Sequence, residues 1–194
     1  MPDRLSEVLN ASLKCFARYN YKKTTMEEIA EELGLTKGAL YSYARSKEDL
    51  YQKAVAYALT KWQAKVREAV EDADRPEDKF MALSFKAFKY LAADHDLRNI
   101  LINDPDIFPM FPKEDPFFEI NENSRNMLRA VLEEGINSNT FRPLDLDSAT
   151  WLLFSIYKMF IIDTYVVSDR EATEKLFKDA VDLLLHGLFS QDRH

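Results

Sequence analysis

Residues 25–43 read TMEEIAEELGLTKGALYSY, a stretch that predicts two short helices joined by a tight turn. Thr25 followed by Glu28 is the pattern of a capping box, which satisfies the first backbone amides of a helix. Gly34 interrupts the helical pattern, because glycine readily takes the left-handed conformation that closes a helix. Between Thr25 and Gly34, the apolar residues have the helical spacing i, i+3, i+4, i+7, at Met26, Ile29, Ala30 and Leu33.

The second helix is expected to run from its N-cap, Thr36, to about Tyr43. Leu35 and Leu40 face the joint between the two helices, and the small side chain of Ala30 lets the helices cross closely. The other residues of this helix are small or polar, so it can lie deep in the major groove of DNA. A helix-turn-helix alone is a moderately specific signal, because an ordinary pair of packed helices has the same pattern.

Helical spacing continues on both sides of this pair. A helix is predicted from about Asp3 to Tyr19, closed by Asn20 in the left-handed conformation. Ser46, with Asp49 three residues later, caps a long helix that runs to about Asp72. The inner side of the first helix should carry Leu5, Val8, Leu9, Leu13 and Phe16.

The second half of the chain is also helical by its apolar spacing. Four prolines make the connection at 104–116 irregular. Asn139 is the expected left-handed residue of a turn, and Asp145 or Asp147 should cap the helix that follows. Helices are predicted at about 76–94, 96–103, 117–138, 147–168 and 170–189. The fold class is therefore all-α, with about nine helices and no convincing strand.

The charge of the chain is unevenly distributed. The net charge of −7 argues against nucleic-acid binding at first sight. Residues 14–47, however, hold 7 basic and 4 acidic side chains, a local excess of +3. Binding to DNA needs local and not global positive charge, so this excess is compatible with a DNA-binding surface.

A wider pattern is more specific than the helix pair. It comprises VLNA at 8–11, NYKKTT at 20–25, LGLTKGALY at 33–41 and SKEDL at 46–50, and it closely resembles the signature of the TetR/AcrR (tetracycline-repressor-like) family over about residues 5–55. The family's usual glycine before the tyrosine is Asn20 here, a tolerable exchange at a left-handed site. Its usual phenylalanine after Tyr43 is Ala44, which removes a packing side chain, so the second helix of the pair should be seated differently or less firmly.

The resemblance implies a transcriptional regulator, by default a repressor, that binds operator DNA as a homodimer. It implies a three-helix DNA-binding domain at 1–46 and a helical effector-binding and dimerisation domain at 47–194. A small, largely apolar effector would release the protein from DNA. No cofactor is expected.

The chemistry of individual side chains suggests roles at the DNA. Lys37 can reach a phosphate or a guanine edge, and Lys47 adds a charge where the first amides of a helix favour an anion. Tyr41 and Tyr43 can donate hydroxyl groups to phosphates, although their spacing of two leaves open that one of them belongs to the core. The residues expected to contact DNA are Thr25, Thr36, Lys37, Gly38, Ala39, Tyr41, Ser42, Tyr43 and Lys47.

Residues 80–160 are rich in aromatic side chains, most of which should form the core and the dimer interface. The resemblance implies that some of them line an effector pocket between helices. The lining expected from the sequence is Phe85, Phe88, Phe108, Phe111, Phe117, Tyr157 and Phe160.

The segment 149–167 is almost entirely apolar, interrupted by Lys158 and Asp163. Each such charge costs about 2.5–3.5 kcal/mol near the centre of a membrane span, so we expect a buried helix and no membrane insertion. A helix that is apolar on most faces needs partners on all of them. The helices at about 147–168 and 170–189 are therefore the predicted homodimer interface.

Other classes of protein are less compatible with the sequence. It has no glycine-rich phosphate loop and no Gly-x-Ser-x-Gly elbow, so an enzyme is not expected. His95 lies between two aspartates, but adjacent residues on a helix point apart, and no metal site is predicted. The single cysteine, Cys15, fits a reducing cytosol, and the lack of a signal peptide favours a cytoplasmic protein. A helical protein-interaction module without DNA binding remains the alternative.

Overall fold

The computed structural model describes residues 4–104, 107, 115–162, 175–176 and 178–183. Within these ranges every regular element is a helix, which confirms the all-α prediction. The N-terminal elements are α1 (Arg4–Lys23), α2 (Met26–Glu32) and α3 (Lys37–Leu40). The later elements are α4 (Lys47–Glu71), α5 (Pro76–Met81), the π-helical segment η1 (Ala82–Lys86), α6 (Ala87–Ala93), α7 (His95–Asn103), α8 (Phe118–Asn137) and α9 (Leu146–Ile162). Residues 175–176 and 178–183 are also helical.

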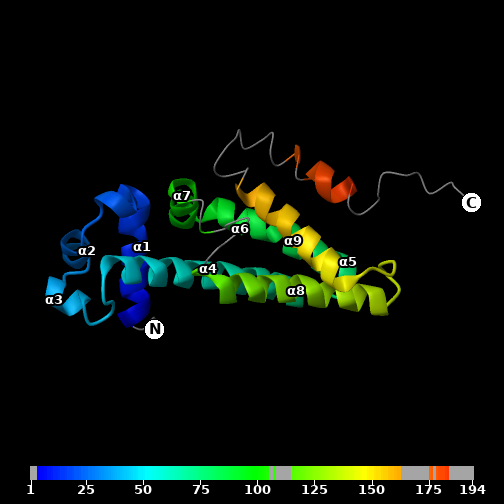
Figure 1. Cartoon of the computed structure of the whole chain (residues 1–194), viewed down its shortest axis with the longest axis horizontal. Helices are drawn as coiled ribbons and strands as arrows, with labels where there is room; N and C mark the ends of the chain where they lie inside the picture. Colours follow the sequence, from blue (N-terminus) through cyan, green and yellow to red (C-terminus); the bar gives the residue numbers. More distant parts are fainter. Residues whose placement is uncertain (1–3, 105–106, 108–114, 163–174, 177, 184–194) are drawn as a thin grey trace, which may run out of the picture.

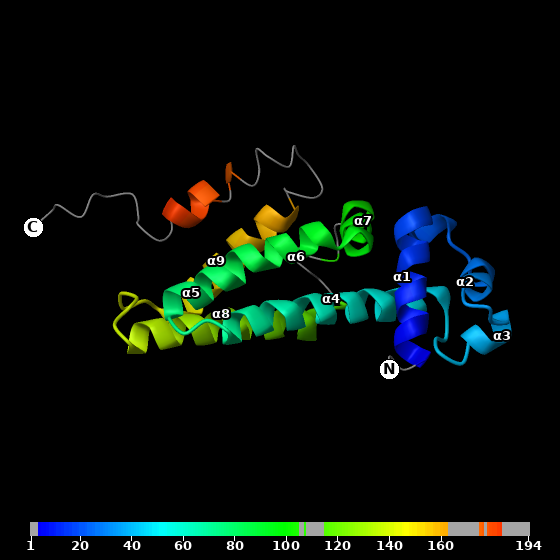
Figure 2. The same ribbon diagram turned by 180° about the vertical axis from the view of Figure 1, so that it is seen from behind.

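Two parts of the molecule are joined by α4, as Figure 1 shows. We call α1–α3 the head, and α5–α9 the body. Helix α4 has 25 residues, which corresponds to a length of about 37 Å at 1.5 Å per residue. Its first turns pack against α1, and its later turns pack against α5, η1, α6 and α8 (Figure 2).

The ends of the head helices are fixed by local side-chain caps. Thr25 and Glu28 form the complete capping box that the sequence predicted. Gly34, with a φ of 62°, closes α2, and the amide of Leu35 donates to the carbonyl of Ala30 at 2.8 Å. The same closure occurs at the end of α8, where Asn139 has a φ of 58°.

The other predicted caps are also present. Thr36 accepts a hydrogen bond from the amide of Ala39, and Ser46 accepts one from the amide of Asp49. Of the two candidates for the cap of α9, the structure selects Asp145, whose side chain accepts from the amide of Ser148 at 2.8 Å.

One apolar core runs through the head and into the body. Val8 and Phe16 of α1, Ile29 of α2 and Leu40 of α3 are fully buried. This core continues along α4 and reaches α6 and α7, as at Leu91. A second cluster lies between α4, α5, α8 and α9.

The structure corrects three predicted details. Leu5 was expected on the inner side of α1 but is 44% exposed, because it lies in the first turn, beyond the core of the head. The sequence pattern predicts that the first helix ends at Asn20. In the structure the helix is interrupted at Asn20 but continues to Lys23. The predicted helix at 76–94 contains η1, a π-helical turn that no pattern in the sequence indicates.

Two further predictions concern the end of the chain and the membrane. Most of the predicted connection at 104–116 and of the helix at 170–189 lies outside the described residues. Of the helices that the structure does describe, none combines the length and the hydrophobicity that a membrane span requires.

Candidate DNA-binding surface and effector cavity

Helix α3 lies at the outermost end of the head, on the side away from α5, α8 and α9 (Figure 1). Leu40 is completely buried and fixes the helix to the core of the head. Lys37, Gly38 and Ser42 are exposed, and Tyr41 is 45% exposed. One face of α3 is therefore anchored, and the opposite face is open to a partner.

Gly38 leaves this open face flat. A Cβ atom added at Gly38 would meet nothing closer than Thr36 Oγ1, at 3.9 Å. Its φ is not in the left-handed region, in contrast to Gly34. Among the described residues, neither packing nor backbone conformation requires a glycine at this position.

Lys37 forms an ion pair with Glu27, the second residue of α2. Both groups are exposed. The hydrogen bond from the ammonium raises the pKa of Lys37 and lowers the pKa of Glu27. Both side chains are therefore charged near neutral pH, and the cation nearest the start of α3 already has a carboxylate partner.

The two tyrosines after α3 have different surroundings. Tyr41 projects into solvent, whereas Tyr43 is half-buried and packs against the core of the head. The backbone carbonyl of Tyr43 accepts a hydrogen bond from Lys53 Nζ at 3.0 Å. Ala44, which follows it, is 2% exposed and belongs to the same core. The sequence had left open that one tyrosine is partly core, and this residue is Tyr43.

Lys47 makes structural hydrogen bonds that the sequence did not predict. Its Nζ donates to the carbonyl of Tyr21 at 2.9 Å and to the carbonyl of Thr24 at 3.1 Å. The ammonium also lies 4.5 Å from the centre of the Tyr21 ring. The first residue of α4 is thereby bonded to the connection between α1 and α2.

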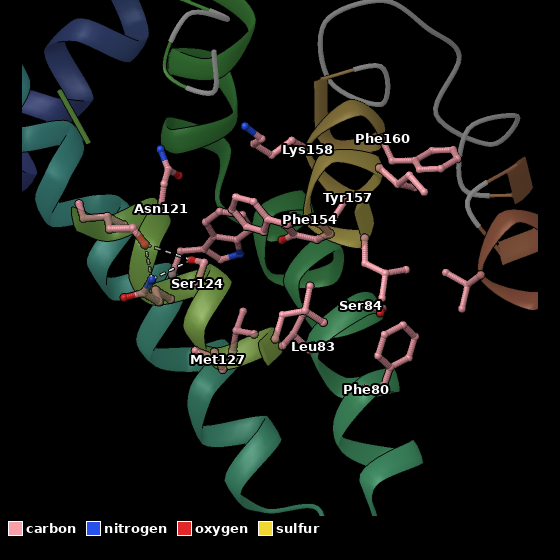
Figure 3. A pocket seen from close by; sticks show the side chains of 18 of the residues that line it. Phe80, Leu83, Ser84, Asn121, Ser124, Met127, Phe154, Tyr157, Lys158 and Phe160 are labelled. Carbon is pink, nitrogen blue, oxygen red and sulfur yellow. Dashed lines mark hydrogen bonds between the residues drawn. The ribbon is translucent and has the colours of Figure 1, made fainter. Parts of the chain in front are cut away.

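The body contains an apolar cavity of about 60 Å³ (Figure 3). Phe80, Leu83 and Met127 line it from α5, η1 and α8, and Phe154 and Phe160 line it from α9. Helix α4 contributes four residues at the spacing i, i+3, i+4, i+7, namely Leu59, Trp62, Gln63 and Val66.

Polar side chains lie at one end of this cavity, opposite Phe80, Leu83 and Met127, namely Asn121 and Ser124 of α8 and Lys158 of α9 (Figure 3). Gln63 of α4 also lines the cavity and is hydrogen-bonded to Ser124. Burial lowers the pKa of Lys158. A cavity with apolar walls and a few convergent polar groups has the usual make-up of a small-molecule site.

The aromatic residues predicted to line the pocket are only partly those that do so. Tyr157 and Phe160 line the cavity. Phe85 and Phe88 do not, and Phe88 instead packs edge-on against Tyr157, with ring centres 5.8 Å apart. Phe117 is 4% exposed and belongs to the core that continues from the head. Phe108 and Phe111 lie outside the described residues.

Sequence reasoning missed the cavity residues of α4, because their spacing is the same as that of any buried helix face. One signal was available in Gln63, a polar residue in the middle of the apolar series at 59, 62 and 66. Ser84, which lies in the π-helical turn and is 7% exposed, is a second such polar residue.

Large apolar side chains remain exposed on the last two helical segments. Trp151, Leu152 and Met159 of α9 are 58%, 51% and 48% exposed. Leu176 and Leu183 are 53% and 46% exposed. Residues 151 and 159 are eight apart, which places them on the same side of α9, two turns from each other.

Comparison with known proteins identifies the head. Residues 8–54 match the family model described as bacterial regulatory proteins, tetR family. The transcriptional repressor KstR2 of Mycolicibacterium smegmatis is 28% identical over 168 residues, which cover 86% of this chain and 78% of that protein.

Two solved structures have the same fold over nearly the whole chain. The fatty acid degradation regulator FadR of Bacillus halodurans superposes with a TM-score of 0.78 at 23% identity, covering 98% of this chain and 99% of that one. The regulator FadR of Bacillus subtilis, solved in complex with stearoyl-CoA, superposes with a TM-score of 0.77 at 20% identity, covering 94% and 98%.

Proposed function

Because the chain belongs to the TetR family of bacterial regulatory proteins, we propose that it is a transcriptional repressor that an apolar effector releases from its operator. The observation that carries the proposal is the position of α3. It is anchored by Leu40, flat at Gly38, exposed at Lys37 and Tyr41, and located at the outer end of the head. Such a helix can enter the major groove, which accommodates an α-helix.

The contacts to DNA would divide into two kinds. Lys37, Gly38 and Ala39 begin α3 and would meet base edges, because the N-terminal residues of a recognition helix usually do. Thr25, Thr36, Tyr41, Ser42 and Tyr43 would position the head through phosphates. Lys47 would add a phosphate contact with the third hydrogen of its ammonium group, because two are engaged by the carbonyls of Tyr21 and Thr24.

A selection from random duplex DNA, followed by fluorescence anisotropy, tests this assignment. Lys37→Ala should weaken binding and relax the selected sequence, whereas Lys47→Ala should weaken all sequences about equally. Lys47→Ala should also reduce the slope of log affinity against log salt by about 0.9 for the lost phosphate contact. Lys89→Ala, which removes an equal charge from the exposed side of α6, is the matched control. Failure of the wild-type chain to enrich any sequence would refute the proposal.

We divide the chain for function at Ser46 and Lys47, with the DNA-binding part at 1–46 and the effector-binding and dimerisation part at 47–194. Two copies would associate through α9 and the helical residues 175–176 and 178–183. The exposed apolar side chains Trp151, Leu152 and Met159 support this interface, because contiguous apolar surface of this kind usually marks association.

Sedimentation equilibrium tests the dimer. Trp151→Glu and Met159→Glu should each shift the protein towards the monomer and reduce operator binding, because the two heads would no longer be linked. Ile102→Glu changes an apolar residue of similar exposure, 44%, on α7 and should leave the dimer intact. A dimer unaffected by both substitutions on α9 would exclude this interface.

The effector would act through α4, which both lines the cavity and carries the head. A cavity of about 60 Å³ is too small for a long chain, so such a ligand would have to widen it, and α4 is one of the helices that would move. Ligand and operator would then favour different positions of α4, which is the requirement for release. The apolar walls and the stearoyl-CoA bound to the Bacillus subtilis relative support an effector with a long apolar chain.

Titration of the operator complex with acyl compounds tests this mechanism. An effector should lower operator affinity roughly 5- to 150-fold, the usual range of allosteric coupling. Met127→Trp, which fills the cavity from α8, should abolish the response while leaving operator binding in place. A ligand that binds the cavity without changing operator affinity would contradict the mechanism.

A further inference from the structure

We propose that the effector ends in an acyl carbonyl group, and that the side chains of Gln63 and Ser124 bind this carbonyl. The inference rests on the proposed function, because it concerns the ligand of the same cavity. It adds the chemical class of the ligand's polar end, the two residues that recognise it, and the bonds between α4 and α8 that recognition would break.

Gln63 is a buried amide in a largely apolar wall. It is only 8% exposed, and its Nε2 donates to the carbonyl of Ile120 and to Ser124 Oγ, both at 2.8 Å (Figure 3). An amide buried in this way must be hydrogen-bonded, because leaving it unpaired is costly. Both hydrogen-bond partners of Gln63 Nε2 belong to α8.

The partners of Gln63 do not depend on it. The carbonyl of Ile120 lies inside α8, where the amide of residue 124 is its regular partner. The hydroxyl of Ser124 donates to the same carbonyl at 3.3 Å, which is longer than the usual range for such a bond. Three donors therefore converge on the carbonyl of Ile120. Of these, Gln63 Nε2 and Ser124 Oγ could donate to a ligand instead.

The hydrogen-bond donors of Gln63 and Ser124 favour a ligand whose polar group is an acceptor. A carbonyl oxygen accepts two hydrogen bonds and could take one from Gln63 Nε2 and one from Ser124 Oγ. A hydroxyl group at the same place can also accept, but it brings a donor of its own to a place where several donors already converge on the carbonyl of Ile120. Lys158 lies at the same end of the cavity, where a cation also favours the negative end of a carbonyl dipole or a carboxylate.

Binding at this point would act directly on the helix that carries the head. Gln63 belongs to α4, and its present hydrogen bonds connect α4 to α8. Each bond that Gln63 makes to a ligand replaces a bond to α8. The apolar chain would fill the cavity towards Phe80 and Leu83, and the carbonyl would release α4 from its neighbour.

The test compares three probes with the same chain of sixteen carbons: hexadecanoate, hexadecanoyl-coenzyme A and hexadecan-1-ol. Dissociation constants are measured by titration calorimetry, and release of the operator is measured separately by anisotropy. The wild type should bind one or both acyl probes about 10-fold more tightly than the alcohol, the gain expected from two hydrogen bonds. Preference between the two acyl probes distinguishes a free carboxylate from a thioester as the source of the carbonyl.

Gln63→Leu should remove the preference for an acyl probe over the alcohol, and Ser124→Ala should reduce it. Gln52→Leu, on an exposed face of the same helix, is the matched control and should leave the preference unchanged. Ser124→Ala keeps the inference testable if Gln63→Leu fails to fold.

Equal binding of acid, thioester and alcohol by the wild type would overturn the inference, even if all three release the operator. Retention of the preference in both variants would overturn it as well. If none of the probes bound, the proposed effector itself would be wrong, which separates the failure of the proposed function from the failure of this inference.

Discussion

The ammonium group of Lys37, on the exposed face of α3, is paired with the carboxylate of Glu27 on α2. A phosphate or a guanine must compete with this carboxylate for Lys37, and Glu27 itself repels the DNA backbone. Glu27→Gln should therefore strengthen operator binding by a few-fold at low salt, with a smaller gain at high salt because surface charges are screened. Anisotropy titrations at two salt concentrations measure both effects.

The Lys37→Ala background provides the control for this prediction. There the gain from Glu27→Gln should be smaller, because the competition for the ammonium group is already absent. An equal gain in both backgrounds would mean that Glu27 acts only as a repulsive charge and that its ion pair with Lys37 is irrelevant to DNA binding.

Asn20 has a φ of 62° and a ψ of 163°, a backbone region that is essentially restricted to glycine. Such a conformation costs a non-glycine residue about 1–3 kcal/mol. Glycine would relieve this strain, but it also raises the entropy of the unfolded chain, which offsets about 0.4–1 kcal/mol of the stabilisation. Asn20→Gly should therefore have a free energy of unfolding about 1 kcal/mol higher than Asn20→Ala, which urea denaturation can measure.

Asn20→Ala is the matched variant, because it keeps the strained backbone and loses the hydrogen bond from the amide of Lys23 to Asn20 Oδ1, at 3.2 Å. It should be less stable than the wild type. A glycine variant no more stable than the alanine variant would show that the backbone at residue 20 is not strained in solution.

Tyr51 of α4 donates its hydroxyl to Asp104 Oδ2 at 2.7 Å, at the end of α7. Tyr51→Phe should lower the free energy of unfolding by about 1.5–3 kcal/mol, the usual contribution of a hydrogen bond to a charged group. Burial, with the hydrogen bond to Asp104, raises the pKa of Tyr51 far above its ordinary value of 10.0. The unfolded chain therefore loses this proton at lower pH than the folded chain does.

The sign of the pH dependence follows from this raised pKa. The advantage of the wild type over Tyr51→Phe should be complete below about pH 10 and should decrease as the pH rises beyond it, since the unfolded state ionises first. Chemical denaturation of both proteins between pH 7 and about pH 11 provides the measurement. A difference that stays constant over the whole range would indicate that the Tyr51 hydroxyl is not buried.

Gly135 of α8 lies directly beneath the ring of Phe141. A Cβ atom at position 135 would be 2.0 Å from Phe141 Cδ2, so the ring would have to move, which would disturb its edge-on contact with Phe80 at 6.3 Å. Gly135→Ala should destabilise the protein by about 1–3 kcal/mol despite the better helix propensity of alanine. Thermal unfolding followed by circular dichroism gives the change.

A second substitution distinguishes steric conflict from a backbone effect. In a Phe141→Leu background the smaller side chain leaves room, and Gly135→Ala should then cost much less. The same loss in both backgrounds would assign the effect to the backbone at Gly135 and not to the ring.

Local signals explain how much of the fold could be predicted from the sequence. The caps at Thr25, Thr36 and Ser46 and the left-handed residues Gly34 and Asn139 depend on neighbours within a few positions. Such features are visible in a single chain, because each residue type has its own backbone preference. The turn at 82–86 became π-helical without any comparable local signal.

The sites were less predictable, because they depend on residues that are distant in sequence. Lys47 was interpreted from its place at a helix start, but its bonds go to carbonyls 26 and 23 residues earlier. Phe88 and Phe117 are of the same residue type as the phenylalanines that line the cavity, yet packing places them elsewhere. Helical spacing identifies a buried face, and it does not tell whether another side chain or an empty space lies opposite.

The hydrogen bonds from Lys47 to Tyr21 and Thr24 also determine how a movement of α4 is transmitted to the head. Because the first residue of α4 is joined to the corner between α1 and α2, the head must follow α4 as one piece. Over a lever of about 37 Å, a rotation of about 5° at the far end of α4 displaces the near end by about 3 Å. That distance equals the length of a hydrogen bond, so a slight rearrangement at the cavity suffices to pull α3 out of register with a groove.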